Sequence, residues 1–361
     1  MDGETRSTRL DFVCGDLLSL ARRAARELSD HPDVIGVFVA GGITQGLYTP
    51  NSDIDIYLVG DNSVPDRRQF GIGRTRVDVH HMPLAKLTSL VDAATVADAG
   101  DALAPTVATA DLELLARMSS ADVVADVGAL TALRARLDAG AVALRRQLSR
   151  HWLTTAHLWW EDHDGFNRVG DHDGALDAAR RSLVAAGKAV LVSRGELYPG
   201  PKWVWRQLER SAPRGFPTEH FRNLCRADLI SGADGPSFVD LEHLLQTCLL
   251  AAATVGWHGD TLTDWPVWQR GNGPLTRAPG WHPRARNTGV VAALAGRRRV
   301  AMRPDVALVW ALCDGVTDKE LADRIRTVRA RIPAYPQFTD QRRAAVVERL
   351  VDWRLLVRGR G

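Results

Sequence analysis

Residues 36–60, GVFVAGGITQGLYTPNSDIDIYLVG, place Asp53 and Asp55 at the start of an otherwise apolar strand. Alternate residues of a strand share a face, so both carboxylates point one way while Ile54 and Ile56 point into a core. Two like charges that lose their hydration this close together repel, and proteins tolerate them mainly around a cation. Oxygen ligands favour a hard ion such as Mg²⁺. The pattern therefore predicts a divalent metal site.

A third carboxylate and a glycine pair accompany this motif. Asp78, in the segment RTRVDVHHMP, alternates with Val77 and Val79 on a predicted neighbouring strand. Three carboxylates on one face could hold two metal ions about 3.5–4 Å apart, which clamp the attacking and leaving oxygens in phosphoryl or nucleotidyl transfer. Asp78 could instead take the proton from the attacking hydroxyl. Gly41 and Gly42 end the preceding strand, where unhindered backbone amides can approach a phosphate.

Taken singly, an Asp-x-Asp pair and a Gly-Gly pair also occur in surface turns. In this order and spacing, with Ser52 before the first aspartate, they resemble the nucleotidyltransferase superfamily of the DNA polymerase β type over roughly residues 30–85. The resemblance implies that Asp53 and Asp55 bind two Mg²⁺ ions and that Asp78 is a third ligand or the base. It also implies that the glycine pair and Ser52 contact the triphosphate of a nucleotide.

One position departs from the family pattern. Many members that act on small molecules have Ser at the second glycine and a basic residue three places later, where this chain has Gly42 and Gln45. We therefore expect triphosphate contacts from elsewhere. Residues 180–208 are similar to a segment of the helical domain in antibiotic-modifying members, and they contain Lys188 and Lys202, two of only four lysines. Lysine is a compact donor to phosphate, so both are candidate nucleotide-binding residues.

Histidines and tryptophans form two further groups of candidate residues. His80 and His81 closely follow Asp78, and either one lies near the site or both are incidental. An aromatic cluster recurs at helical spacing and is interpreted as packing between helices, with substrate stacking as the alternative. Its members are His151, Trp152, His157, Trp159 and Trp160.

The chain is predicted to be an α+β protein with four parts. Residues 1–95 are predicted to be the polymerase-β-like catalytic domain with a mixed sheet. Its predicted elements are an amphipathic helix at 10–28 and strands at 33–40, 53–59, 69–72 and 76–80. Residues 96–256 are rich in Ala and Leu with helical periodicity, which predicts a helical bundle. The resemblance to nucleotidyltransferases implies that this bundle closes over the nucleotide and selects the substrate. Residues 257–299 are predicted to be an irregular connection because Gly and Pro punctuate them. Residues 300–361 are predicted to be a small winged helix.

The winged-helix prediction rests on the order of elements in residues 300–361: helix, helix, long helix and short strand. Thr317, with Glu320 three residues later, has the signature of a capping box. The segment is similar to the small peptide-binding domain of pyrroloquinoline-quinone biosynthesis. Peptide binding, nucleic-acid binding, and packing or homodimer formation remain open as its role.

Composition excludes several classes of protein. With 45% hydrophobic and 25% charged residues, the chain has the composition of a soluble globular protein. Its N-terminus is polar and its apolar runs are short, which predicts a cytoplasmic location and no membrane partner. Four scattered cysteines suggest neither disulfides nor a zinc site. The net charge of +3, without a long basic track, disfavours nucleic acid as a partner. No GxxxxGK[ST] loop is present.

The sequence as a whole predicts an Mg²⁺-dependent nucleotidyltransferase. It would transfer a nucleoside monophosphate, AMP from ATP, to a hydroxyl of a small molecule and release pyrophosphate, in natural-product biosynthesis or antibiotic modification. The alternatives are a protein AMPylator or antitoxin-type nucleotidyltransferase, and a catalytically silent regulatory protein that binds a nucleotide.

Overall fold

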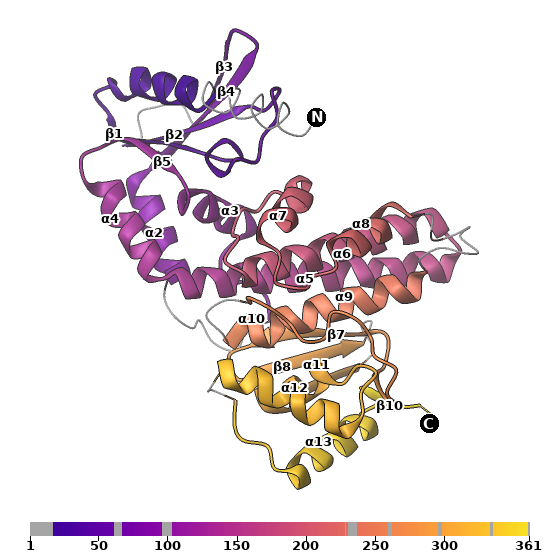
Figure 1. The fold of residues 1–361 in the computed structure, drawn as a ribbon. Helices are drawn as coiled ribbons and strands as arrows, with labels where there is room; N and C mark the ends of the chain where they lie inside the picture. Colours follow the sequence, from indigo (N-terminus) through magenta and orange to yellow (C-terminus); the bar gives the residue numbers. More distant parts are fainter. Residues whose placement is uncertain are drawn as a thin grey trace, which may run out of the picture. The chain divides into compact units, whose positions relative to one another are not determined.

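The computed structural model describes eight stretches of the chain (Figure 1). These are residues 17–60, 67–95, 103–227, 229, 237–258, 262–294, 298–332 and 335–359. The described residues divide into two compact units. The first unit takes its residues from 1–97, 107–144 and 197–199, and the second from 98–106, 145–196 and 200–361.

A mixed five-stranded sheet forms the centre of the first unit, in the order β3-β4-β2-β1-β5. The strands are β1 (Val34–Ala40), β2 (Ile54–Gly60), β3 (Arg67–Ile72), β4 (Thr75–Pro83) and β5 (Asp122–Asp126). β2 and β4 run parallel, whereas the other neighbouring pairs are antiparallel. The four strands predicted within residues 33–80 are thus confirmed, and so is the mixed α+β class.

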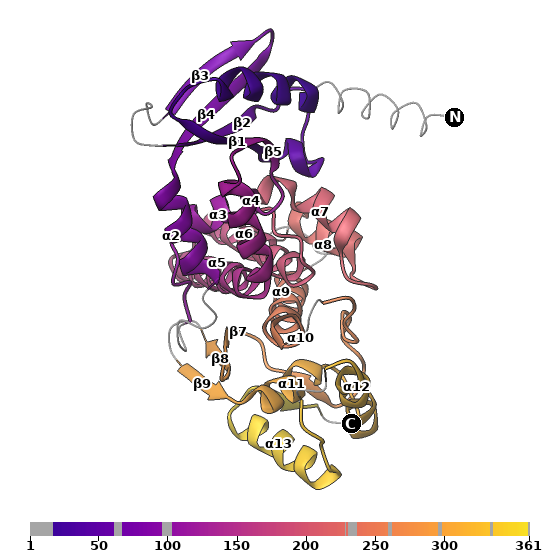
Figure 2. The same ribbon diagram turned by 90° about the vertical axis from the view of Figure 1, so that its left-hand side faces the viewer.

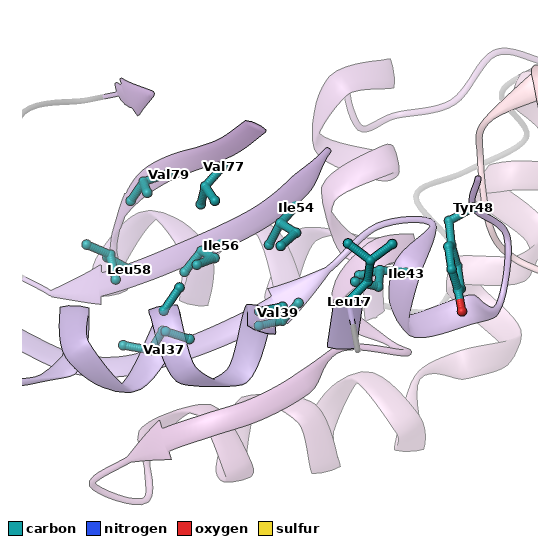
Figure 3. Close-up of a cluster of buried hydrophobic side chains, with 13 residues drawn as sticks. Leu17, Val37, Val39, Ile43, Tyr48, Ile54, Ile56, Leu58, Val77 and Val79 are labelled. Carbon is teal, nitrogen blue, oxygen red and sulfur yellow. The ribbon is translucent and has the colours of Figure 1, made fainter. Parts of the chain in front are cut away.

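One face of this sheet is covered by the helix at residues 17–29, which Figure 2 shows from a second side. The first residues of the helix predicted at 10–28 lie outside the described residues. Ile54 and Ile56 are fully buried in this core, as predicted, together with Val37, Val39 and Val77 (Figure 3). Burial of a branched aliphatic side chain is worth about 1.5–3 kcal/mol, so this face stabilises the sheet and the opposite face is left for polar groups.

The remaining helices of the first unit flank the sheet. They are the short 3-10 turn η1 (Ile43–Gln45), α2 (Leu84–Thr95), α3 (Thr109–Met118) and α4 (Ala129–Ala139). β5 lies within residues 96–256, for which the sequence predicted a helical bundle. After the strand ends, the carboxylate of Asp126 accepts hydrogen bonds from the amides of Leu130 and Thr131 in the first turn of α4, whose N-cap is Gly128.

The second unit begins with a helical bundle in which α6 packs along α9. Its helices are α5 (Ala141–Val169), which starts in the first unit, α6 (His172–Ser193), η2 (Pro201–Trp203), α7 (Val204–Ser211), α8 (Thr218–Arg226), α9 (Phe238–Ala253) and α10 (Val255–His258). Among the described residues, one helical stretch, Phe238–His258, is long and apolar enough to cross a membrane. Since 72% of its most apolar window is buried, it has the environment of a core helix in a soluble protein.

The C-terminal part of the second unit combines two small sheets with three helices. The strands are β6 (Leu275–Arg277), β7 (Trp281–Arg286), β8 (Gly289–Leu294), β9 (Arg298–Met302) and β10 (Leu356–Arg358). The helices are α11 (Pro304–Leu312), α12 (Asp318–Arg331) and α13 (Asp340–Asp352). β7, β8 and β9 form an antiparallel sheet, and β6 pairs with β10.

Two sequence predictions concern this part. Residues 257–299, expected to be irregular, contain β6, β7, β8 and the start of β9; Pro283 is accommodated because β7 is an edge strand. The capping box at the start of α12 is confirmed, since Thr317 and Glu320 exchange hydrogen bonds between side chain and backbone. The winged helix stays a prediction.

Three histidines and a tryptophan pack together where α5 meets β7. The ring of His282 on β7 contacts the rings of His157 and Trp160 on α5, and Trp160 also contacts His163. For Trp160 and His157 this agrees with the packing interpretation of the aromatic cluster. His282 is fully enclosed, and among the residues that the structure describes neither of its ring nitrogens has a hydrogen-bond partner. Burial, together with the neighbouring His157 and His163, lowers the pKa of His282 to about 3.

This cluster predicts acid lability of the fold. The pKa of His282 in the folded state lies below its value in the unfolded state, so protonation of His282 favours unfolding. The neutral side chain contributes fully to stability above the unfolded pKa of about 6.5. This contribution is lost as the pH falls below about 6.5. Between about pH 6.5 and pH 5 the loss from this one group is about 2 kcal/mol. Urea unfolding measures the free energy of unfolding at both pH values. Between about pH 6.5 and pH 5 this free energy should fall by about 2 kcal/mol less in His282→Phe than in wild type. His172→Gln, at an exposed position, should behave like wild type; an equal acid loss in His282→Phe would contradict the assignment.

Candidate active site

The three predicted carboxylates meet in the register of the sheet. β2 and β4 pair so that Asp55 lies directly opposite Asp78, and Asp53 immediately precedes β2. Paired residues and alternate residues share a face, so all three lie on the face opposite Ile54 and Ile56. The structure therefore brings together the three aspartates that the sequence singled out.

Each carboxylate has a polar neighbour. The Arg76 guanidinium lies between Asp53 and Asp78: it forms an ion pair with Asp53, and its Nη2 is 3.3 Å from Asp78 Oδ2. Gln69 Nε2 donates to Asp78 Oδ1 at 2.5 Å, and His80 Nε2 lies 3.3 Å from Asp55 Oδ1. The side chain of Asp78 is 4% exposed, against 35% for Asp53 and 27% for Asp55. Two carboxylates are thus open to solvent, and the third is held inside.

Oxygen-only donors on one face fit a hard divalent cation by type. Within the described stretches, however, no three acidic, histidine or cysteine side chains are arranged to hold a metal ion. Arg76 supplies the positive charge between Asp53 and Asp78 instead. Since the Arg76 side chain is 56% exposed, it can turn into solvent when a cation replaces it. The donors therefore fit the metal, provided that the side chains rearrange around it.

An aromatic row lies next to the carboxylates on the same face. Tyr57 stacks between Phe38 and His80, with ring centroids 4.8 and 4.7 Å apart. Burial raises the pKa of Tyr57, whose hydroxyl is hydrogen-bonded to Arg117 of α3. This stack fixes the ring of His80 beside Asp55. Of the two candidate histidines, His80 is therefore at the site, whereas His81 alternates to the opposite face.

Tyr198 joins the site from a distant part of the sequence. Residues 197–199 belong to the first unit by their contacts. Tyr198 is buried, which raises its pKa, and it interacts electrostatically with Arg117, Asp55 and Asp53. Sequence reasoning missed Tyr198, Arg117, Gln69 and Arg76. Gln69 and Arg76 could have been found, because Arg76 precedes Asp78 by two and Gln69 lies on the neighbouring strand.

The glycine pair and Ser52 shape the approach to the carboxylates. Gly41 has a φ of +95°, and a Cβ placed on it would lie 2.6 Å from Asp55 Oδ2. The carbonyl of Gly42 accepts hydrogen bonds from the amides of Gln45 and Leu47, at 3.2 and 2.8 Å. Ser52 Oγ accepts from the amide of Thr49 at 2.9 Å and so holds the turn before β2. Their contact with a triphosphate stays a prediction.

Gly41→Ala is expected to destabilise the protein for two reasons, backbone strain and the clash with Asp55. Gly73 is a matched control, since its φ is +60° but nothing lies within 4 Å of an added Cβ. Both variants carry the strain of a positive φ, about 1–2 kcal/mol. Overlap with Asp55 should cost Gly41→Ala about 1–3 kcal/mol more. Urea unfolding measures both; equal losses would mean that Asp55 moves aside without cost.

The two candidate lysines lie in the second unit. Lys188, on α6, is fully buried, and its Nζ donates to Gln207 Oε1 at 2.7 Å. The same Nζ lies 5.6 Å from the centroid of the Trp152 ring. Lys202, in η2, is exposed and its Nζ lies 5.5 Å from the Trp203 ring. Their contact with a nucleotide phosphate stays a prediction.

Comparison with known proteins gives a family for the N-terminal part. Residues 21–97 match the family model described as nucleotidyltransferase domain, a span that contains β1 to β4 and all three aspartates. Among solved structures, the chain is similar to a nucleotidyltransferase-like protein from Exiguobacterium sibiricum 255-15, with 15% identity and a TM-score of 0.36 over 65% of this chain and 77% of that chain. No curated protein sequence matched the chain.

Proposed function

We propose that the protein is a nucleotidyltransferase, since residues 21–97 match the nucleotidyltransferase domain, and that it transfers AMP from ATP to a hydroxyl of a small molecule with the help of Mg²⁺. The observation that carries this proposal is the pairing of Asp55 with Asp78 across β2 and β4, with Asp53 one step away on the same face. Three carboxylates in one place are unfavourable unless a cationic group joins them.

Asp53 and Asp55 would hold the metal, because they are the two carboxylates that solvent reaches. When bound, Mg²⁺ supplies positive charge to the phosphate oxygens of the nucleotide. His80 keeps Asp55 in place from one side, since its ring is itself fixed by stacking on Tyr57. Arg76 neutralises Asp53 and Asp78 before substrate arrives.

Asp78 is proposed to accept the proton of the acceptor hydroxyl. The hydroxyl oxygen bonds to the α-phosphorus, its proton passes to the Asp78 carboxylate, and the bond from the α-phosphorus to the bridging oxygen breaks to release pyrophosphate. Gln69 holds Asp78 Oδ1 and Arg76 approaches Oδ2, so the carboxylate is fixed in orientation. A fixed base in reach of the proton typically contributes about 10²–10⁴-fold to the rate.

A calorimetric titration tests the nucleotide site. ATP, CTP, GTP and UTP, each with Mg²⁺, are titrated into wild type, into Asp53→Asn/Asp55→Asn, and into Asp138→Asn, a control at an exposed position of α4. We expect Mg²⁺-dependent binding of ATP to wild type and to the control, and none to the double variant. Tighter binding of another nucleotide would replace ATP as the donor. No binding of any nucleotide to the folded wild type would overturn the proposal.

A further inference from the structure

A pocket of about 270 Å³ lies in the second unit, between α9 and the two-stranded sheet of β6 and β10. One wall is a single face of α9, where Val239, Glu242, His243 and Gln246 follow at helical spacing. Thr276 and Arg277 of β6 and Val357 of β10 form the opposite wall. The volume is close to the lower end of the range for ligand sites, about 300 Å³, so the pocket suits a small molecule.

The floor of the pocket is a neutralised charge network. Arg277 Nη2 donates to Asp314 Oδ2 at 2.7 Å and to Thr247 Oγ1 at 2.5 Å, and His243 Nε2 bonds to the same carboxylate. The Arg277 and Asp314 side chains are both almost completely buried. The Arg277 Nε–H, however, is buried without a hydrogen-bond partner among the described residues. This donor is enclosed in the protein, so the charges of the network are balanced among its own members.

Two further charges line the pocket without pairing with each other. Glu242 accepts a hydrogen bond from the Gly280 amide through Oε1, and burial raises its pKa. Arg270 interacts at longer range with Asp314. In the part of the chain that the structure describes, neither Glu242 nor Arg270 belongs to an ion pair. Opposite charges that face one apolar pocket and do not meet are complementary to a molecule that carries both charges.

We propose that this pocket binds a small zwitterion with an apolar body, of the chemical class of a free apolar amino acid. Its carboxylate is held by Arg270, and its ammonium group by Glu242. Its side chain packs against Val239 and Val357, both well exposed in the absence of a ligand. The site consists of second-unit residues only and goes beyond the proposed nucleotidyl transfer.

Calorimetry on the full chain without nucleotide tests the proposal. The probes are L-phenylalanine, which has both charges, 3-phenylpropionate, which has only the carboxylate, and phenethylamine, which has only the ammonium group. We expect L-phenylalanine to bind, and each single-charge probe to bind at least about tenfold more weakly, since each loses one charged contact. Equal binding of the three probes, or no binding of any probe to the folded protein, would overturn the proposal.

Two variants test which pocket residues bind the carboxylate and the ammonium group of the ligand. Glu242→Gln keeps an oxygen for the Gly280 amide, and Arg270→Gln removes the guanidinium; each should weaken L-phenylalanine binding at least about tenfold. The matched controls Glu219→Gln and Arg326→Gln change exposed residues of the second unit and should bind like wild type. Thermal melting shows that every variant is folded. Wild-type affinity in both pocket variants would refute the assigned contacts. Because no nucleotide is present, the outcome is independent of the catalytic proposal.

Discussion

Asp55→Asn is expected to lower the rate of nucleotidyl transfer by at least about a thousandfold, equivalent to about 4 kcal/mol of transition-state stabilisation. Asp55 occupies the centre of the site, opposite Asp78 and beside His80. An amide carries no charge and is a weaker ligand for a hard cation, so the variant should lose Mg²⁺-dependent nucleotide binding as well. Pyrophosphate release from ATP in the presence of an acceptor measures the rate, and calorimetry measures the binding.

The fold should survive this change. The Asp55 side chain is partly solvent-exposed, Asn has the same shape, and the core on the other face of β2 is untouched. Melting temperature and circular dichroism should therefore match wild type, and Asp138→Asn should keep full activity. Unchanged turnover in a folded Asp55→Asn variant would remove this carboxylate from the mechanism.

Asp78→Asn separates the two roles of the carboxylates. If Asp78 is the base, the variant should keep nucleotide binding and lose turnover by about 10²–10⁴-fold. Gln69 Nε2 can still donate to the amide oxygen, so the local geometry is retained. Loss of nucleotide binding as severe as in Asp55→Asn would instead make Asp78 a metal ligand, the alternative that the sequence left open.

The part of the site that lies on the strands could be predicted from one rule, the alternation of side chains between the two faces of a strand. Alternation along a strand places Asp53 and Asp55 on one face, and the register of β2 with β4 then brings Asp78 opposite Asp55. The same rule predicts Arg76 and His80 at the site. It cannot predict Arg117 or Tyr198, because these reach the sheet from α3 and from a segment more than a hundred residues away, through contacts without a local pattern.

The fold shows a similar limit. A continuous apolar run made β1 predictable, and the alternation of Asp with Ile made the start of β2 predictable, whereas β5 lies in a segment for which helices were predicted. In β5 the two adjacent valines favour a strand, and Asp126 at its end accepts a hydrogen bond from the Leu130 amide in the first turn of α4. In residues 257–299 the glycines and prolines were interpreted as breakers, although several of them occupy hairpin and edge positions that strands tolerate.

The pairing of Arg277 with Asp314 could not be predicted from the sequence either. Asp314 precedes Gly315 and has the sequence context of a turn, but its side chain is buried against Arg277 from β6. Burial by itself would raise the pKa of Asp314, yet Arg277 and His243 lower it below its usual value. The carboxylate is thus charged in the interior and depends on these partners.

Asp314→Ala is therefore expected to destabilise the protein by about 3–5 kcal/mol, because it leaves the Arg277 guanidinium buried without a counter-charge. Asp323→Ala is the matched control: Asp323 pairs with Arg326 on the surface of α12, and loss of an exposed pair costs about 0–1 kcal/mol. Urea unfolding at neutral pH measures both variants.

The double variant Arg277→Met/Asp314→Leu identifies the cause of this loss. Removing both charges also removes the desolvated ion, so the double variant should be more stable than Asp314→Ala although it carries two changes. Stability recovered in this way would show that the cost of the single change is an uncompensated charge. A double variant no more stable than Asp314→Ala would show instead that the hydrogen bonds of Arg277 to Thr247 and the Ala311 carbonyl hold β6 in place.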